Sequence, residues 1–129
     1  LGHLLPLVNR VAQLSRQYDV IYTNTQKALV VGALASAISR RPLVYHLRDI
    51  LSAEHFSRTN RSLAIALANR FAVRVIANSE ATGAAFVSAG GRAELVRVIY
   101  NGFDPSLYET PDPSPEALRQ QLGLSDRFV

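Results

Sequence analysis

The chain contains four short segments rich in β-branched and aromatic residues, and the distances between them are what most constrain its fold. These segments are DVIYTN at residues 19–24, PLVYHL at 42–47, VRVIANS at 73–79 and LVRVIYN at 95–101, and this composition is typical of β-strands. Their apolar cores begin at intervals of 23, 30 and 23 residues, near Val20, Leu43, Val73 and Val96. A β-hairpin needs only a few connecting residues, whereas each of these gaps accommodates a crossover helix. We therefore predict four parallel strands.

Two of the gaps have the patterns of helices. Residues 26–39 are apolar on nearly every face, which predicts a helix buried on several sides, and either Asn24 or Thr25 can cap its exposed amides. Residues 53–72 carry an apolar stripe spaced at three and four residues, which predicts one amphipathic helix.

Two further helices complete the pattern. Ser79 is a good first residue for a helix that Gly90 and Gly91 would end, and residues 4–18 form another amphipathic helix before the first strand. Helices alternating with parallel strands predict an α/β fold, a Rossmann-like doubly wound parallel sheet with right-handed crossovers.

The composition changes after Tyr100. Four prolines are followed by a short helical segment with Ser114 at its start and Gly123 just past its end. We predict an α/β domain over residues 1–104 and, over 105–129, a linker, a short helix and the start of another domain, with DRFV opening that domain's first strand. Because the chain starts with leucine and contains no methionine, we expect a piece of a longer protein, truncated at both ends.

Composition excludes several classes of protein. The 129 residues are 48% hydrophobic and 19% charged, as expected for a globular domain, and the absence of cysteine fits a reducing compartment such as the cytoplasm. Apolar runs are too short to span a membrane. The net charge is +4, but the arginines are scattered without interleaved aromatics, so we expect no binding to nucleic acid. Weak attraction to anionic lipid or to phosphorylated small molecules remains open.

Polar residues follow each predicted strand, at the edge where parallel α/β sheets bind ligands. They are Thr23, Asn24, Thr25 and Lys27 after the first strand, His46, Arg48 and Asp49 after the second, Asn78, Ser79 and Glu80 after the third, and Asn101, Gly102 and Asp104 after the fourth. The sequence therefore predicts a site built from four loops.

His46 has the most specific chemistry of these residues. A neutral imidazole can donate a hydrogen bond to a substrate hydroxyl while its other nitrogen is oriented by an acceptor. The alternative is a histidine at a strand end that is bonded to backbone, and the residues alone leave both open.

The other residues also have structural interpretations. Thr25 and Ser79 lie where helix caps are expected, and capping is the favoured role of each taken singly. Arg48 and Asp49 can form an ordinary exposed pair, and Lys27, the one lysine, can be solvated. Asn101 and Gly102 form a dipeptide typical of turns, which predicts a turn over residues 101–104.

With these motifs, residues 19–129 resemble part of the amino-terminal domain of a family 4 glycosyltransferase, a two-domain enzyme of the GT-B type. The resemblance rests on DVIYTN entering an apolar helix, PLVYHLRD, VIANSEAT with the glycine pair that follows it, and VIYNGFD leading to LGLSDRFV, in this order and spacing.

The resemblance implies that the full-length protein transfers a sugar from a nucleotide-sugar donor to an acceptor hydroxyl with retention of configuration. This part would build the acceptor side of the cleft, while a missing carboxy-terminal domain would hold the nucleotide. By position, His46 matches the histidine that reaches the reacting sugar, Ser79 the serine that opens a helix, and Asn101 and Gly102 the interdomain turn. Asn24, Thr25, Lys27, Arg48, Asp49 and Glu80 are further candidate substrate-binding residues. No metal or other cofactor is implied.

The resemblance also suggests partners: an acceptor glycan, lipid or small molecule, and a peripheral contact with the inner face of the membrane, for which Arg58, Arg61 and Arg70 are the motivating residues. The isolated chain, without the nucleotide-binding half, would be inactive. The alternative is a non-catalytic α/β module that binds a ligand or partner, because doubly wound sheets host many functions.

Overall fold

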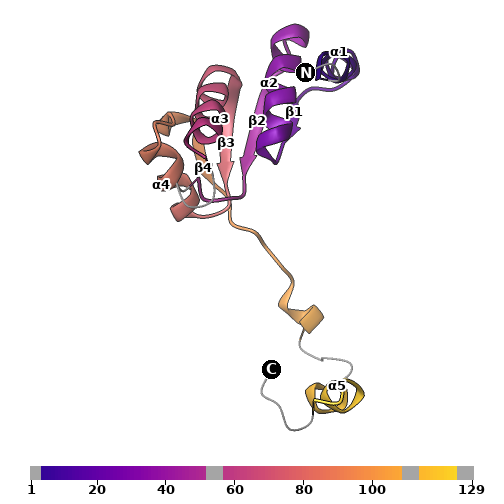
Figure 1. Ribbon diagram of the computed structural model, residues 1–129. Coiled ribbons are helices and arrows are strands. Elements are labelled where there is room, and N and C mark those ends of the chain that lie inside the picture. Colours follow the sequence, from indigo (N-terminus) through magenta and orange to yellow (C-terminus); the bar gives the residue numbers. More distant parts are fainter. Residues whose placement is uncertain (1–3, 52–56, 109–113, 125–129) are drawn as a thin grey trace.

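Four parallel strands form the centre of the molecule, as predicted. The computed structural model describes residues 4–51, 57–108 and 114–124 (Figure 1). Within these residues the strands pair in the order β1-β2-β3-β4, each parallel to its neighbour. Their bounds are Ile21–Thr23 (β1), Leu43–Leu47 (β2), Ala72–Ala77 (β3) and Val96–Val98 (β4). Each strand is shorter than the segment that predicts it.

The predicted helices are also present. They are Leu4–Ser15 (α1), Gln26–Ser39 (α2), Arg58–Phe71 (α3), Glu80–Ser88 (α4) and Pro115–Gln121 (α5), with short 3₁₀ helices at Ala93–Leu95 (η1) and Pro105–Tyr108 (η2). The observed α2 has the predicted bounds because the Thr25 hydroxyl accepts a hydrogen bond from Ala28 N (3.1 Å) at its start. For α3, the predicted residues 53–56 lie outside the described part, and Ser57 caps the observed start.

The core lies between the sheet and the helices on one of its faces. Strand residues that point to this face are buried: Ile21, Thr23, Leu43, Tyr45, Leu47, Val75 and Ala77. Gly32 brings α2 close to this face, because a Cβ at that position would lie 2.5 Å from Thr23 Cγ2 and 3.4 Å from Ile21 Cγ2. Gly83 brings α4 to the same face, beside Ala77. Helix α1 packs against α2 (Figure 1).

The opposite face of the sheet is left open by the described helices. Its strand residues are Tyr22, Val44, His46, Arg74, Ile76 and Arg97, paired across the sheet as Tyr22 with Val44, His46 with Ile76, and Ile76 with Arg97. All six are exposed or half-buried. Consecutive strand order explains this, because successive right-handed crossovers in one direction place their helices on the same side. The predicted Rossmann-like α/β fold is confirmed.

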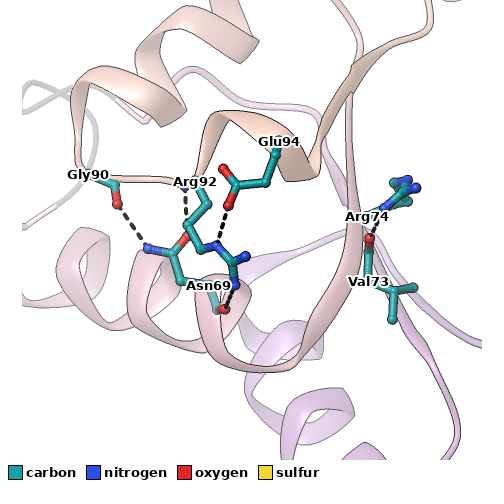
Figure 2. A network of polar contacts seen from close by, with 6 residues as sticks. All are labelled: Asn69, Val73, Arg74, Gly90, Arg92 and Glu94. Carbon is teal, nitrogen blue, oxygen red and sulfur yellow. Dashed lines mark hydrogen bonds and ion pairs between the residues drawn. The ribbon is translucent and has the colours of Figure 1, made fainter.

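Hydrogen bonds from Asn69 hold the segment that leads into β4 (Figure 2). The Asn69 side-chain amide donates to Gly90 O, and its oxygen accepts from Arg92 N, both at 2.9 Å. Arg92 also pairs with Glu94 at 2.8 Å, although both side chains are exposed and such pairs contribute about 0–1 kcal/mol. The end of α3 is thereby tied to the end of α4, where Gly90 adopts a left-handed conformation, as predicted for a helix terminus.

Beyond β4 the chain leaves the sheet, and η2 and α5 lie away from it (Figure 1). The Ser114 hydroxyl accepts from Ala117 N (3.2 Å) and Gly123 is left-handed just past the end, which confirms the predicted limits of α5.

The predicted turn at residues 101–104 is wrong, since this segment has no regular structure and Gly102 is not left-handed. Asp104 instead accepts hydrogen bonds from Ser106 N and Oγ at 3.0 and 2.7 Å, and the chain continues into η2. The strand predicted at 126–129 lies outside the described residues.

Candidate functional site

The carboxyl ends of the strands place most of the predicted site residues along one edge of the sheet. Because all pairings are parallel, the residues that follow each strand leave the sheet at this edge. Asn24, Thr25 and Lys27 follow β1, Arg48 and Asp49 follow β2, and Ser79 and Glu80 follow β3. Asn101 and Gly102 come three and four residues after the end of β4 and are exposed.

A cavity of about 600 Å³ lies at this edge, between the first turns of α2 and α3. Its polar wall is formed by Thr25, Gln26, Lys27, Asp49 and Asn60, and its apolar wall by Val30, Leu63 and Ala64. Three predicted site residues, Thr25, Lys27 and Asp49, are therefore brought together by the fold. The volume is in the range of about 300–1,000 Å³ that small-molecule sites have.

His46 lies outside this cavity, on the open face of the sheet. It is the penultimate residue of β2, and its Nδ1 lies 2.6 Å from the Tyr22 hydroxyl on β1. The two rings meet edge to face, with centroids 5.8 Å apart. The hydrogen-bond partner of His46 is thus a side chain, and not the backbone that the structural interpretation expected. The bond orients the imidazole and leaves Nε2 as the nitrogen for another contact.

Polar residues after β3 bond to one another. Asn78 donates to Arg48 O (3.1 Å) and accepts from the Thr82 hydroxyl (2.9 Å), which links the loops after β2 and β3. The Ser79 hydroxyl accepts from Thr82 N (3.1 Å), so Ser79 caps α4 as its sequence position predicts. Glu80, the first residue of α4, is exposed and is not part of the wall of the α2–α3 cavity.

A buried tyrosine senses the charge of Asp49, one of the residues that line the cavity. Tyr45 is 2% exposed, and burial raises the pKa of its hydroxyl from 10.0 to about 12, with a further contribution from the charge of Asp49. The hydroxyl therefore stays protonated across the physiological range.

The described residues contain neither a candidate metal centre nor a membrane-spanning helix. Within them, no three His, Asp or Glu side chains are grouped so that they could hold a metal ion. None of the helices over the same residues combines the length and the apolar character that crossing a bilayer requires.

A parallel sheet with flanking helices, and with polar side chains around a cavity at its carboxyl edge, is the arrangement of Rossmann-like ligand-binding domains. The sequence model of Glycosyltransferase Family 4 matches residues 1–107. The chain therefore belongs to this family, as the resemblance predicted.

Solved structures of HepE from Anabaena are similar to this chain over nearly all of its length. The HepE complex with UDP-glucose is 64% identical in sequence to this chain, with a TM-score of 0.90. The match covers 99% of this chain and 35% of the HepE chain. The HepE complex with UDP and glucose has the same sequence identity and TM-score, and the match covers 100% of this chain and 35% of the HepE chain. This chain thus spans about a third of the length of those structures. A comparison with curated proteins gives no match.

Several site residues were not predicted from the sequence. Tyr22 could have been found from strand alternation, because it lies between two buried residues of its own strand, as His46 does in β2, and both side chains therefore point to the other face. No local pattern marks Val30, Asn60 and Leu63 as site residues, because they come together only through the packing of α2 against α3.

Proposed function

We propose that the full-length protein containing this chain is a glycosyltransferase that moves a sugar from a UDP-sugar to an acceptor hydroxyl, with retention at the anomeric carbon. The observation that supports this most strongly is the 64% identity, over 99% of this chain, to HepE, which was solved with UDP-glucose. In the reaction the bond from the anomeric carbon to the diphosphate oxygen breaks and a bond to the acceptor oxygen forms. The diphosphate leaves with the electron pair, and the acceptor proton passes to it or to solvent.

Residues 1–104 form the acceptor side of the cleft in this proposal, and residues 105–129 lead into a further domain that holds the nucleotide. The chain alone is then inactive. The direction of the chain after β4, away from the sheet, supports this division (Figure 1).

His46 is the proposed contact to the reacting sugar. Its Nδ1 is hydrogen-bonded to the Tyr22 hydroxyl, and the proposed tautomer is the one in which Nδ1 accepts, so that Nε2 carries the proton and donates to a sugar oxygen. Asn24, Thr25, Lys27, Arg48, Asp49 and Glu80 bind substrate from the loops beside it, while Ser79, Asn101 and Gly102 shape the cleft.

The test is turnover of the full-length protein with UDP-glucose and a panel of acceptors. His46→Ala should lower kcat/KM by about 10²–10³-fold, a typical effect of losing a group that bonds the reacting atoms. Tyr22→Phe should cost less, because the imidazole is retained, and Tyr18→Phe, at an exposed tyrosine before β1, is the matched control. Unchanged turnover in His46→Ala rejects the role of this residue. A wild-type protein that transfers no sugar from UDP-glucose or from a panel of other UDP-sugars rejects the function.

We also propose that the full-length protein works in the cytoplasm, on cell-envelope polysaccharide, with a peripheral contact to the membrane. Two exposed arginines on α3, Arg58 and Arg70, support attraction to anionic lipid. Co-sedimentation with phosphatidylglycerol vesicles at low salt should be reduced in the double variant Arg58→Ser with Arg70→Ser. Absence of wild-type binding under these conditions counts against the membrane contact.

A further inference from the structure

The cavity between α2 and α3 is lined in part by apolar side chains. They are Val30 of α2 and Leu63 and Ala64 of α3. Leu63 is 48% exposed, although its neighbour Ala64 is buried. A ligand that covers Leu63 removes apolar surface from water, which favours binding by roughly 25 cal/mol per Å².

The charged groups at the cavity have opposite signs. Lys27 contributes an ammonium group and Asp49 a carboxylate, and both side chains are exposed. Over the described part of the chain the one ion pair joins Arg92 to Glu94, so neither charge is neutralised by a partner there. An anion attracted by Lys27 is repelled by Asp49, and among the described lining residues there is no arginine with its planar fork of donors. This balance disfavours phosphorylated ligands.

The same polar groups suit hydroxyls. Lys27 donates hydrogen bonds, Asp49 accepts them, and the Asn60 amide does both. Each sugar hydroxyl also donates and accepts, so adjacent hydroxyls of a pyranose ring can be satisfied by these three side chains. The apolar wall and the polar wall together match an uncharged ligand that has one polar end and one apolar end.

We propose that this cavity binds the acceptor, and that the acceptor is a neutral glycoside with an apolar aglycone. Its sugar hydroxyls bond to Lys27, Asp49 and Asn60, and its aglycone lies against Val30, Leu63 and Ala64. The inference rests on the proposed sugar transfer and adds the chemical class of the acceptor, which the family and the compared structures do not specify.

Binding to the full-length protein, measured by saturation-transfer NMR without donor, tests the inference independently of turnover. The probes are 4-nitrophenyl β-glucopyranoside, methyl β-glucopyranoside and glucose 6-phosphate. The nitrophenyl glucoside should bind about tenfold more tightly than the methyl glucoside, as expected for filling an apolar pocket. Leu63→Ser should remove this advantage. Leu14→Ser is the matched control, because Leu14 is 52% exposed on α1, away from the cavity.

The charge balance has its own test. Wild-type protein should bind glucose 6-phosphate more weakly than the nitrophenyl glucoside. Asp49→Asn should reduce the ratio of the two dissociation constants severalfold. Equal binding of the two glucosides, an advantage that survives Leu63→Ser, or tighter binding of glucose 6-phosphate would each overturn the proposal. Binding as expected without sugar transfer refutes the proposed function alone, and transfer without the aglycone preference refutes this inference alone.

Discussion

Gly32 in the middle of α2 provides a quantitative test of how the helix meets the sheet. A Cβ added there would lie 2.5 Å from Thr23 Cγ2 and 3.2 Å from Leu43 Cδ1. The first distance is far below van der Waals contact, so a group must move. Thr23 is β-branched and its hydroxyl donates to Val44 O at 3.3 Å, so rotating its methyl away breaks that bond. We therefore expect Gly32→Ala to destabilise the domain.

Two opposing effects set the size of the change. Overpacking of a core typically costs about 1–3 kcal/mol, whereas replacing glycine with alanine inside a helix stabilises it by about 1 kcal/mol. The net result for Gly32→Ala is a loss of about 1 kcal/mol. Gly83 in α4 is the matched control, because a Cβ there would lie 3.3 Å from Val96 Cγ1 and 3.6 Å from Ala77 Cβ. Small adjustments accommodate it, so Gly83→Ala should stabilise the domain by up to about 1 kcal/mol.

Amide hydrogen exchange of the full-length protein measures the stability of this domain separately from the rest of the protein. The amides to follow are those of α2, α4 and their adjacent strands. The two variants should differ by about 2 kcal/mol, which is roughly thirtyfold in the opening equilibrium. Thr23→Ser removes the methyl that clashes, so in the Thr23→Ser background Gly32→Ala should no longer destabilise. Equal stabilisation by both glycine substitutions, or no rescue by Thr23→Ser, would show that the described contact between α2 and β1 is wrong.

Two further predictions concern stability. The pKa of the Tyr45 hydroxyl is 10.0 in the unfolded chain and about 12 in the folded chain. The protonated hydroxyl therefore contributes stability that is fully present below pH 10 and is lost as the pH rises toward 12. The loss in the free energy of unfolding is up to about 3 kcal/mol. Urea unfolding at pH 9 and 11.5 should show that Tyr45→Phe reduces this loss, and an identical pH dependence would contradict it. Asn69→Ala removes the two side-chain bonds from Asn69 to Gly90 O and Arg92 N that Figure 2 shows, and should destabilise the loop before β4 by about 1–2 kcal/mol. Faster exchange of β4 amides tests this, and exchange equal to wild type would refute it.

Much of the fold could be predicted because it depends on local patterns. The spacing of the four strands requires crossovers, and hydroxyl residues at Thr25, Ser79 and Ser114 cap helices where their positions predict. The wrong prediction concerns residues 101–104, where an Asn-Gly pair forms no turn, and the Asp104 carboxylate accepts hydrogen bonds from Ser106 at the start of η2. A dipeptide preference of this kind is weak compared with the path that neighbouring elements impose.

The candidate site was predictable in part. That Thr25, Lys27 and Asp49 follow strands is visible in the sequence, and parallel pairing brings them to one edge. His46 was placed correctly near the end of β2, but its position on the opposite face from the cavity was not anticipated, nor was its bond to Tyr22.

By itself, the sequence determined the order of helices and strands, because the hydrophobic period and the capping residues act over a few neighbouring positions. Only the tertiary structure decided which strand face is covered, that α2 and α3 enclose a cavity, and that His46 pairs with Tyr22. These features depend on strand register and helix packing between residues far apart in the chain, about which a local pattern carries little information.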